Sequence, residues 1–330
     1  MTMNKRQLGF SGIDASVIGL GTWAMGGWMW GGTNEKDAVA AIQESITCGV
    51  SLIDTAPAYG LGRSEELVGK AIKGQRDKVV LATKCGLVWH TQQGNHFFDE
   101  EGKPVHRYLG RDAIQYELEQ SLRRLGTDYI DLYITHWQDP TTPIEETMAT
   151  LMDLKQQGKI RAIGVSNISL DDLKQYQRFG TVDAVQEKYN MIERELEQSL
   201  LPHTRATGVS CLSYSSLALG LLSGKISADR TFDGDDQRLS NPLFSQPNRQ
   251  IVQQFCQSVT PLAKDYGISV AQLVIAWTLS QPGITYALCG ARNPSQAAEN
   301  ARAGEVNLAA TDVDTISTLV AQSLSQLQTD

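Results

Sequence analysis

Short apolar runs alternate with longer amphipathic stretches along almost the whole chain. A short apolar run bounded by polar residues or glycine is typical of a buried strand, and apolar positions three or four residues apart are typical of a helix with one buried face. The pattern predicts strands at residues 15–21, 50–54, 79–84, 129–135, 160–166, 182–186, 209–214 and 284–290. It predicts helices at residues 35–49, 64–72, 111–125, 143–157, 196–205, 249–265, 269–280, 294–303 and 311–324, and one more that begins after Ser169. Ser64 and Ser169 are the expected N-caps of their helices.

Strands that alternate with helices predict a parallel sheet joined by right-handed crossovers. An open doubly wound sheet would alternate in the same way, but the count of eight strands and the polar residue at nearly every strand end favour a closed (β/α)8 TIM barrel. Residues 6–18 contain a glycine turn between two short extended runs, so we expect an N-terminal β-hairpin that plugs the bottom of the barrel. Residues 85–110 and 215–248 lack periodicity and are expected to be long loops after the third and seventh strands. No linker divides the chain, so we expect residues 1–330 to form a single domain that ends in a C-terminal helix.

Composition narrows the function without naming it. A chain of 330 residues suits one β/α barrel, and its net charge of −8 argues against nucleic acid as a partner. No apolar run has the length of a membrane span, and the first residues lack the apolar region of a secretory signal. The five cysteines are scattered and form no CxxC pair, so we expect neither a metal site nor a disulfide scaffold, and a reducing cytoplasm is the expected compartment. The sequence makes no oligomeric partner evident.

Three of the predicted strands lead to side chains with useful chemistry. Asp54 ends the second strand and is followed by Tyr59, Lys84 ends the third strand, and His136 follows the fourth. In a parallel barrel, strand ends of one polarity open onto one face, and that face carries the chemistry. We therefore expect a carboxylate, a phenol, an ammonium and an imidazole to meet there. Each residue alone is more often structural than catalytic, and it is the joint placement that points to a site.

These four groups fit the reduction of a carbonyl. Negative charge develops on the carbonyl oxygen as it accepts a hydride, so a proton donor must lie beside it. Tyr59 can donate, but a free phenol has a pKa of about 10 and is a weak acid near neutrality. A neighbouring ammonium favours the phenolate, so we expect Lys84 to lower the pKa of Tyr59 and Asp54 to hold Lys84 charged and in place. His136 can donate a hydrogen bond to the carbonyl oxygen and orient it.

Motifs along nearly the whole chain resemble those of the aldo-keto reductases. They are GLGTW at 19–23, DTAPAYGLGRSEELVGKAI at 54–72, Lys84, IDLYITHWQDP at 130–140, IGVSN at 163–167, VQEKYN at 185–190, YSSLALGLLSGK at 214–225 and GARNPSQAAEN at 290–300. They fall in the order typical of the family, and the chain is most similar to a bacterial branch near the potassium-channel β-subunit-like reductases. The resemblance implies a TIM barrel that reduces aldehydes or ketones with NADP(H), and it makes Asp54, Tyr59, Lys84 and His136 the catalytic residues.

The resemblance also implies where the cofactor binds. Thr22, Trp23 and Asp54 would lie near the nicotinamide, Ser166, Asn167 and Gln186 would bind its carboxamide, and Tyr214 would stack on its ring. Ser215, Leu217, Ala218, Gly220 and Lys225 would surround the pyrophosphate, and Gly290, Arg292, Gln296, Glu299 and Asn300 would hold the adenosine half. Arg238 is a further candidate for a phosphate contact. An acidic chain needs a local cation for a 2′-phosphate, and Arg292 follows the eighth strand at a helix N-terminus.

Two departures from the classical reductases bear on the choice of cofactor. The classical enzymes carry a lysine where this chain has Gly290 and an arginine where it has Gln296. Fewer cations at the adenosine end weaken the case for strict NADPH use, so NAD(H) remains an alternative cofactor. The pair Glu187 and Lys188 also departs from the common form, and the sequence offers no reason for it.

Aromatic residues predict the substrate wall. Trp23, Trp28 and Trp30 belong to the first loop, Trp89 lies in the third, and Trp137 follows His136. With Tyr59 and His136, these side chains suggest a pocket for apolar or aromatic carbonyl compounds. Ordinary loop packing explains any one tryptophan equally well, and the physiological carbonyl is not readable from the sequence.

Two other functions fit parts of the pattern. The first is a regulatory or redox-sensing subunit that holds NADPH and turns over slowly, although the complete set of four catalytic candidates argues against binding alone. The second is an aldolase that uses Lys84 as a Schiff base. That role needs a lysine of depressed pKa, whereas a neighbouring Asp54 favours the charged ammonium.

Overall fold

The computed structural model describes residues 3–328, and its centre is a closed barrel of eight parallel strands. In barrel order the strands are β3 (Ile18–Gly21), β4 (Leu52–Asp54), β5 (Val80–Cys85), β9 (Ile130–Thr135), β10 (Ile160–Ser166), β11 (Ala184–Lys188), β12 (Ser210–Tyr214) and β13 (Tyr286–Gly290). β13 pairs with β3 and closes the ring. The predicted TIM barrel is therefore confirmed, and each predicted strand lies within a few residues of an observed one.

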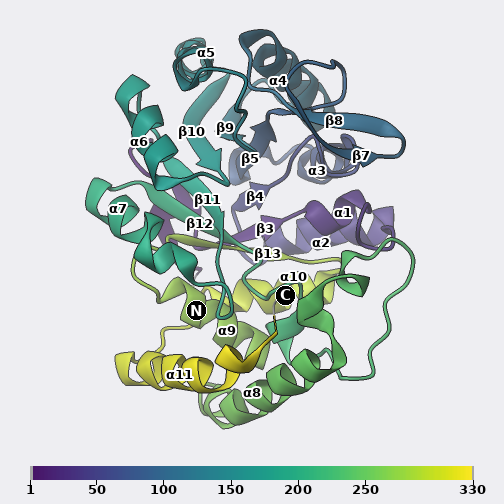
Figure 1. The fold of residues 1–330 in the computed structure, drawn as a ribbon, viewed down its shortest axis with the longest axis vertical. Helices are drawn as coiled ribbons and strands as arrows, with labels where there is room; N and C mark the ends of the chain where they lie inside the picture. Colours follow the sequence, from purple (N-terminus) through teal and green to yellow (C-terminus); the bar gives the residue numbers. More distant parts are fainter. Residues whose placement is uncertain (1–2, 329–330) are drawn as a thin grey trace.

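Helices surround the barrel, as Figure 1 shows. The outer ring consists of α2 (Glu35–Thr47), α3 (Arg63–Ile72), α4 (Arg111–Leu125), α5 (Ile144–Gln156), α6 (Leu170–Phe179), α7 (Leu200–Thr207), α9 (Val270–Leu279) and α10 (Pro294–Ala303). Two further helices, α8 (Gln246–Asp265) and α11 (Ala310–Ser323), pack against each other beyond α9. Ser169 caps α6 by accepting a hydrogen bond from the backbone N–H of Asp172, as predicted.

Short 3₁₀ turns complete the chain. They cover Arg76–Lys78, Glu195–Gln198, Leu221–Ser223, Gln237–Leu239, Pro242–Phe244 and Leu324–Gln326. Three of them interrupt the segment from residue 215 to residue 245, which otherwise has no regular structure and forms the predicted long loop after the seventh barrel strand. In Figure 1 this loop reaches from the region of α1 (Trp23–Gly26) to α8.

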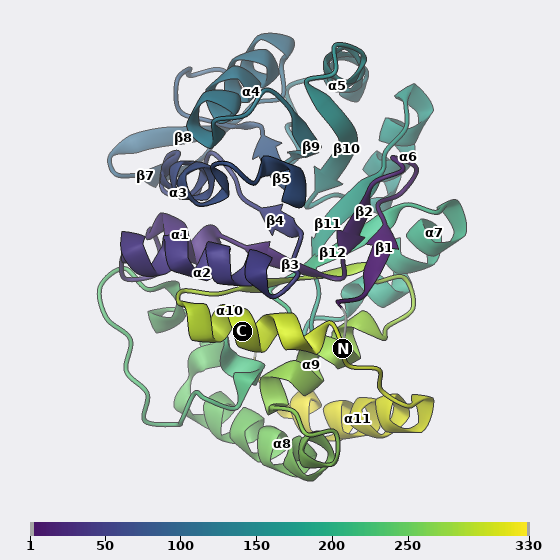
Figure 2. The ribbon, with the colours of Figure 1, turned by 180° about the vertical axis from the view of Figure 1, so that it is seen from behind.

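The N-terminal hairpin lies behind the barrel in the view of Figure 1 and in front of it in Figure 2. It pairs β1 (Lys5–Gln7) with β2 (Asp14–Ser16). Leu8 and Ile13, in its turn, are buried among inward-facing residues of the barrel. Gly9 has a φ of +50°, and a Cβ there would lie 2.1 Å from the carbonyl oxygen of Asp183, so only glycine permits this close approach. The hairpin therefore plugs the barrel as expected.

The long segment after β5 differs from its prediction. It is not a plain loop but a small antiparallel sheet of β6 (Leu87–Val88), β8 (Lys103–Arg107) and β7 (Asn95–Glu100). The turn between β7 and β8 consists of Glu101 and Gly102, whose φ angles are +51° and +75°. Two residues of positive φ match the twist of a two-residue hairpin, so the Glu-Gly pair was the available signal in the sequence. The sheet extends the wall of the barrel on one side of its mouth.

Two local predictions are wrong. Ser64 does not cap α3, whose N-cap is Gly62; its buried hydroxyl lies instead 2.7 Å from the Thr22 hydroxyl and 2.9 Å from that of Thr55. The single strand predicted at 15–21 is divided, because Asp14–Ser16 pair with the hairpin and Ile18–Gly21 pair with the barrel. The short helix α1 was not predicted, since it is too short for a helical repeat.

Candidate active site

The alternation of side chains along each barrel strand brings polar groups to one end of the interior. On β5, Ala82 faces the apolar interior and Lys84, two residues further, lies above it. On β4 the same step leads from Leu52 to Asp54. Because the period of a strand is two, each apolar core position predicts the direction of the polar side chain at the strand end. The polar ends therefore meet at one mouth of the barrel.

Lys84 and Asp54 form a buried ion pair at this mouth. The Lys84 ammonium donates to both carboxylate oxygens of Asp54, at 2.9 and 2.8 Å, and to the carbonyl oxygen of Thr55 at 2.9 Å. Gln186 Nε2 donates to Asp54 Oδ1 at 2.8 Å. The two charged side chains are only 1% and 4% exposed. The pair is thus held by several hydrogen bonds, which a buried ion pair needs if it is to offset the cost of desolvation.

Tyr59 lies above this pair, on the turn that follows β4. Its hydroxyl oxygen is 3.1 Å from Lys84 Nζ. The turn is packed directly against α1, because a Cβ on Gly26 would lie 2.6 Å from the carbonyl oxygen of Tyr59, and a Cβ on Gly60 would lie 2.3 Å from that of Gly26. Backbone-to-backbone contact at two glycines fixes the position of the Tyr59 ring relative to the barrel.

The expectation that Lys84 lowers the pKa of Tyr59 is wrong for this structure. Burial and the negative charge of Asp54 hold the pKa of Tyr59 well above 10. The physical reason is that burial disfavours the charged phenolate, and the Asp54 carboxylate, which lies against the same ammonium, adds to this effect. Burial also lowers the pKa of Lys84, and Asp54 acts in the opposite direction. Tyr59 is therefore a neutral phenol that can donate a proton, and the 3.1 Å contact offers the ammonium to the oxygen once the proton has left.

His136 borders the same space. Its ring meets the Tyr59 ring edge to face, with the ring centroids 5.6 Å apart. Burial and the positive charge of Lys84 keep the pKa of His136 well below its usual value. A neutral imidazole has one N–H to donate, so His136 can bind a carbonyl oxygen without competing for the proton that Tyr59 supplies.

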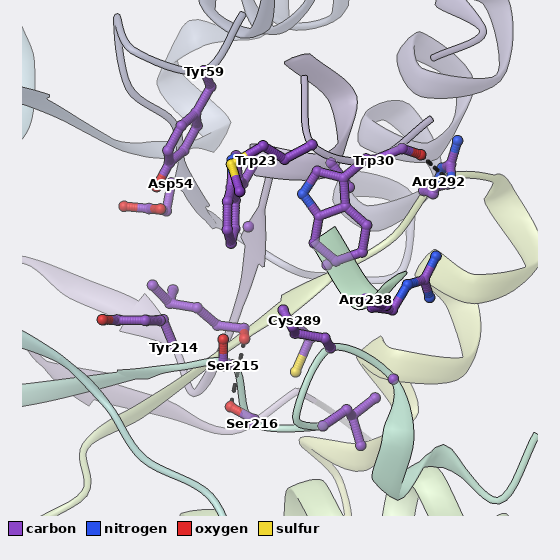
Figure 3. A pocket seen from close by; sticks show the side chains of 18 of the residues that line it. Trp23, Trp30, Asp54, Tyr59, Tyr214, Ser215, Ser216, Arg238, Cys289 and Arg292 are labelled. Carbon is purple, nitrogen blue, oxygen red and sulfur yellow. Dashed lines mark hydrogen bonds between the residues drawn. The ribbon is translucent and has the colours of Figure 1, made fainter. Parts of the chain in front are cut away.

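A cleft of about 900 Å³ opens above these residues. Most of the predicted site residues line it: Trp23, Trp28, Trp30, Asp54, Tyr59, His136, Trp137, Ser166, Asn167, Gln186, Tyr214, Ser215, Leu217, Gly220, Lys225, Arg238, Gly290, Arg292, Gln296, Glu299 and Asn300. Figure 3 shows Asp54 and Tyr59 on one side of Trp23, and Trp30, Arg238 and Arg292 on the other. The cleft is therefore elongated, from the Tyr59 hydroxyl to a cationic end, and suits a long polar ligand.

Four predicted residues do not line the cleft. Thr22 is buried, and its hydroxyl lies 2.9 Å from the carbonyl oxygen of Asp54. Lys84 lies beneath Asp54, and Ala218 is buried within the loop after β12. Trp89 packs in the small apolar cluster around Leu87. In this structure, these residues can influence a ligand only through the residues that they support.

Several features of the cleft fit a dinucleotide. The indole Nε1 of Trp30 is buried and has no hydrogen-bond partner within residues 3–328, and the Trp30 ring meets the Trp23 ring edge to face, with the centroids 5.5 Å apart. Asn293 caps α10 beside the cationic end, where a helix N-terminus favours negative charge. Arg292 donates to the carbonyl oxygens of Trp30 and Gly32, at 3.3 and 2.8 Å. The chain thus has donors and cations where phosphates would lie.

Much of the cleft's cationic charge is already paired. Arg238 binds Asp236, and Lys225 binds Glu299. Arg230 also lines the cleft, a residue that the sequence analysis missed. Neither Arg292 nor Arg230 forms a salt bridge with a carboxylate in the part of the chain that the structure describes. Both can offer charge to a ligand, although Arg292 lies close enough to Asp236 to contribute, after Arg238, to the lowered pKa of that carboxyl.

The part of the cleft lined by Trp28 and Trp137 is aromatic. Trp28 stacks on Phe98 with centroids 4.9 Å apart, and Phe97 packs against Trp137 at 5.1 Å. Phe97 and Phe98 belong to β7. The sequence analysis does not include them among the site residues, because it predicts a loop at residues 85–110. Their hydrophobic pair beside the Glu-Gly turn was the signal that could have found them.

The sequence analysis does not include the other lining residues, although Gly21, Ala58, Ser216, Leu219 and Ser223 lie within the family motifs. These other lining residues are Gly21, Ala24, Met29, Ala58, Leu87, Ser216, Leu219, Ser223, Ile226, Phe232, Ala271, Leu288 and Cys289. Cys289 is buried, and desolvation raises the pKa of its thiol to about 12. A thiol of such high pKa is not a nucleophile near neutrality.

Comparison with known proteins now identifies the family. The profile of the Aldo/keto reductase family matches residues 17–321, so this chain belongs to the aldo/keto reductase family. It is 47% identical to the aldo-keto reductase YhdN of Bacillus subtilis (strain 168) over 289 residues, which cover 87% of this chain and 84% of that protein. It is 40% identical over 316 residues to the NADH-specific methylglyoxal reductase of Escherichia coli (strain K12), covering 94% and 96% of the two chains.

Solved structures agree. The glycerol dehydrogenase AKR11B4 from Gluconobacter oxydans superposes with a TM-score of 0.88 at 36% identity, covering 98% of this chain and 97% of that one. An aldo/keto reductase from Klebsiella pneumoniae, solved with NADP and acetate, superposes with a TM-score of 0.72 at 29% identity, covering 94% of each chain.

As a member of the family, this chain is an oxidoreductase that reduces aldehydes or ketones to alcohols with NADP(H), with NAD(H) as the alternative cofactor. The regulatory alternative is not favoured. The branch within the family stays a prediction. Among residues 3–328, no helix combines the length and the apolar character needed to cross a membrane.

Proposed function

We propose that Tyr59 donates the proton and His136 orients the carbonyl oxygen, while Asp54 and Lys84 set the charge around the Tyr59 hydroxyl. The observation that carries this assignment is the 3.1 Å contact between Tyr59 and an ammonium that Asp54 holds through both carboxylate oxygens. Once Tyr59 gives up its proton, the phenolate lies beside a positive charge and is stabilised. A bound nicotinamide would supply the hydride. Gln186 keeps Asp54 in place from the opposite side of the barrel.

The elongated cleft supports an extended cofactor. We propose that its nicotinamide end lies between Trp23 and Tyr214, with Ser166, Asn167 and Gln186 near its carboxamide. Its phosphates would follow the cleft past Trp30 toward the cationic end. The position of Trp30 in the cleft, between Trp23 and Arg292, supports this path, so Trp30 is proposed to contact the cofactor and not the substrate that the sequence predicts for it.

We propose that NADP(H) is preferred over NAD(H). The support is that Arg292 and Arg230 form no salt bridge with a carboxylate within residues 3–328, so their charge is available to a 2′-phosphate. The relatives point both ways, since the Escherichia coli relative is named for NADH and the Klebsiella pneumoniae structure holds NADP. The balance between the two cofactors is therefore a property to measure on this chain.

The substrate is proposed to be a small carbonyl compound with an apolar or aromatic group. Trp28, Phe97, Phe98 and Trp137 line the end of the cleft near Tyr59 and His136, and offer flat apolar surface. The relatives are named for methylglyoxal and for glycerol, which are small and polar. The ring of an aromatic aldehyde could pack against this aromatic wall, whereas a small polar compound has no apolar group to place there.

A steady-state assay tests the proposal. NADPH and NADH are each oxidised in the presence of 4-nitrobenzaldehyde, methylglyoxal or glyceraldehyde, with wild type and Tyr59→Phe compared. We expect 4-nitrobenzaldehyde and NADPH to give the highest kcat/KM. A Tyr59→Phe variant as fast as wild type would overturn the assignment of the proton donor. Preference for glyceraldehyde would overturn the proposed role of the aromatic wall.

The aldolase alternative is not supported by the position of Lys84. Its ammonium already donates to Asp54, Thr55 and Tyr59, and its side chain is 1% exposed. Schiff-base formation needs an amine that reaches the substrate carbonyl. Borohydride should therefore trap no adduct on Lys84, and a trapped adduct would favour the aldolase.

We also propose that residues 1–330 act as one domain and that the protein works in the cytoplasm on a small-molecule substrate. The hairpin plug supports the first point, since Leu8 packs among the inward-facing residues of the barrel. The scattered free cysteines support a reducing compartment.

A further inference from the structure

Glu187 is a buried carboxyl group beside the site, and the roles proposed above do not use it. It lies near the end of β11, directly after Gln186, and its residue is 6% exposed. The alternation of side chains turns Glu187 away from the barrel interior, to the side opposite Gln186. Its Oε1 accepts a hydrogen bond from the backbone N–H of Ile168 at 3.0 Å, and the neighbouring backbone N–H of Asn167 helps to lower the pKa of the carboxyl. Glu187 therefore reaches from β11 to the turn that leaves β10.

That turn has an uncommon backbone. Asn167 has a φ of +53°, in the left-handed region that residues other than glycine rarely adopt. Its side chain connects two candidate site residues: Asn167 Nδ2 donates to the carbonyl oxygen of His136 at 2.8 Å, and the Tyr214 hydroxyl donates to Asn167 Oδ1 at 2.7 Å. Asparagine adopts this region more readily than most residues, and the Glu187 carboxyl holds the turn through the backbone N–H of the next residue, Ile168.

Among residues 3–328, the carboxyl of Glu187 forms no salt bridge. Burial raises its pKa to about 8, and the two backbone N–H groups act to lower it. The titratable groups that its charge affects are Tyr214 and Cys211 of β12, and burial keeps the pKa of each far above neutrality. Lys188, the next residue, is paired with Glu193. A carboxyl group kept in such a place at a cost in solvation is more often functional than incidental.

From these contacts we infer that Glu187 is a positioning residue: it holds the left-handed turn at Asn167, so that the Asn167 amide stays between His136 and Tyr214 and faces the cofactor's carboxamide. The inference rests on the proposed function, because it gives Asn167 a place in the cofactor site. It also explains why this chain departs from the common form at Glu187. A residue without acceptor oxygens at this position would leave the buried backbone donor of Ile168 unbound.

The experiment measures NADP⁺ affinity by titration calorimetry and amide exchange in the cofactor-free protein. Glu187→Ala should raise the Kd for NADP⁺ about tenfold or more, since it leaves a buried donor unpaired. It should also speed exchange at Asn167 and Ile168. Glu187→Gln keeps an acceptor oxygen and should stay within about threefold of wild type. Asp183→Asn is the control: Asp183, directly before β11, accepts a hydrogen bond from the backbone N–H of Ile163 of β10 at 3.0 Å and pairs with Lys155, at the other end of the barrel. The variant loses this ion pair and can cost stability, but it should leave the Kd unchanged.

A double-mutant cycle decides whether Glu187 acts through Asn167. If it does, Glu187→Ala should cost little affinity in an Asn167→Ala background. Full additivity of the two losses would overturn the inference, as would a Glu187→Ala variant with wild-type affinity or a Glu187→Gln variant as weak as Glu187→Ala. The proposed function fails separately, if wild type neither binds NADP⁺ nor oxidises NADPH with any carbonyl.

Discussion

Lys84 donates to both carboxylate oxygens of Asp54, at 2.9 and 2.8 Å, inside the mouth of the barrel. Burial, followed by the negative charge of Asp54, holds the pKa of Tyr59 well above 10 rather than below it. Asp54 also accepts a hydrogen bond from Gln186, which helps to hold it against Lys84. In the proposed mechanism, this arrangement keeps Tyr59 protonated until it reacts and then offers a cation to the phenolate.

Replacing Tyr59 by phenylalanine should remove the proton donor and keep the ring. General acid catalysis contributes about 10²–10⁴-fold, so kcat should fall by at least that order. The Kd for NADP⁺, measured by quenching of tryptophan fluorescence, should change little. A wild-type rate in this variant would mean that another group donates the proton.

Replacing Lys84 by methionine should leave the Asp54 charge unpaired in a buried site. Loss of one partner from a buried ion pair costs about 3–5 kcal/mol, so the melting temperature should fall along with kcat. The pH profile of kcat should also change, since the phenolate loses its cation. The double variant Asp54→Asn, Lys84→Met separates the two effects: it should recover stability and remain inactive. Recovery of activity would mean that the charge pair has only a structural role.

Replacing Arg292 by alanine should weaken NADPH more than NADH. A charge-assisted contact contributes about 1.5–3 kcal/mol, or roughly one to two decades in Kd. Arg302→Ala, an exposed arginine in the last turn of α10, is the control and should change neither value. Equal weakening of both cofactors would mean that Arg292 acts through its bonds to Trp30 and Gly32 and not through a phosphate.

Replacing Gly26 by alanine should displace the Tyr59 turn. The added Cβ would lie 2.6 Å from the Tyr59 carbonyl oxygen, which is backbone and can move only with the turn. Overpacking of this kind costs about 1–3 kcal/mol, and a displacement near 1 Å can cost about 10²-fold in rate. We expect a loss of kcat with the Kd for NADP⁺ nearly retained. Unchanged kcat would show that the close contact of the two backbones does not position Tyr59.

Glu100 should make stability depend on pH. Its carboxyl oxygens are buried and have no hydrogen-bond partner in the part of the chain that the structure describes, and burial raises its pKa to about 7. Because the pKa of Glu100 is higher in the folded state than in the unfolded state, Glu100 stabilises the fold while it is protonated. This contribution to the free energy of unfolding is fully present below about pH 4.5 and is lost as the pH rises through 7. Glu100→Gln should therefore match wild type in melting temperature near pH 5 and exceed it by a few degrees at pH 8. Equal melting temperatures at pH 8 would contradict this placement of Glu100.

Local pattern was sufficient for the barrel because each strand carries its own signal. The residues of β10, β4 and β13 read as apolar runs between polar or glycine boundaries, and their spacing by helices leaves little choice of topology. The same period of two predicts that Asp54 and Lys84 share an interior face. The family motifs then named most residues that line the cleft.

Tertiary contacts decided the hydrogen-bond partners, the pKa values and the loop positions that the sequence pattern could not predict. Ser64 was expected as a cap, but Thr22 and Thr55 lie within reach of its hydroxyl only after α3 docks on the barrel. Whether the pKa of Tyr59 is raised or lowered depends on its burial and on the charges that surround Lys84. No pattern in the sequence near Tyr59 shows this balance. Phe97 and Phe98 reach the cleft because a two-residue turn folds β7 back over the mouth. The sequence by itself determined the barrel and which side chains stand at its strand ends, since these follow from periodicity; the fold alone decided their protonation and their partners, since these depend on distances between segments far apart in the chain.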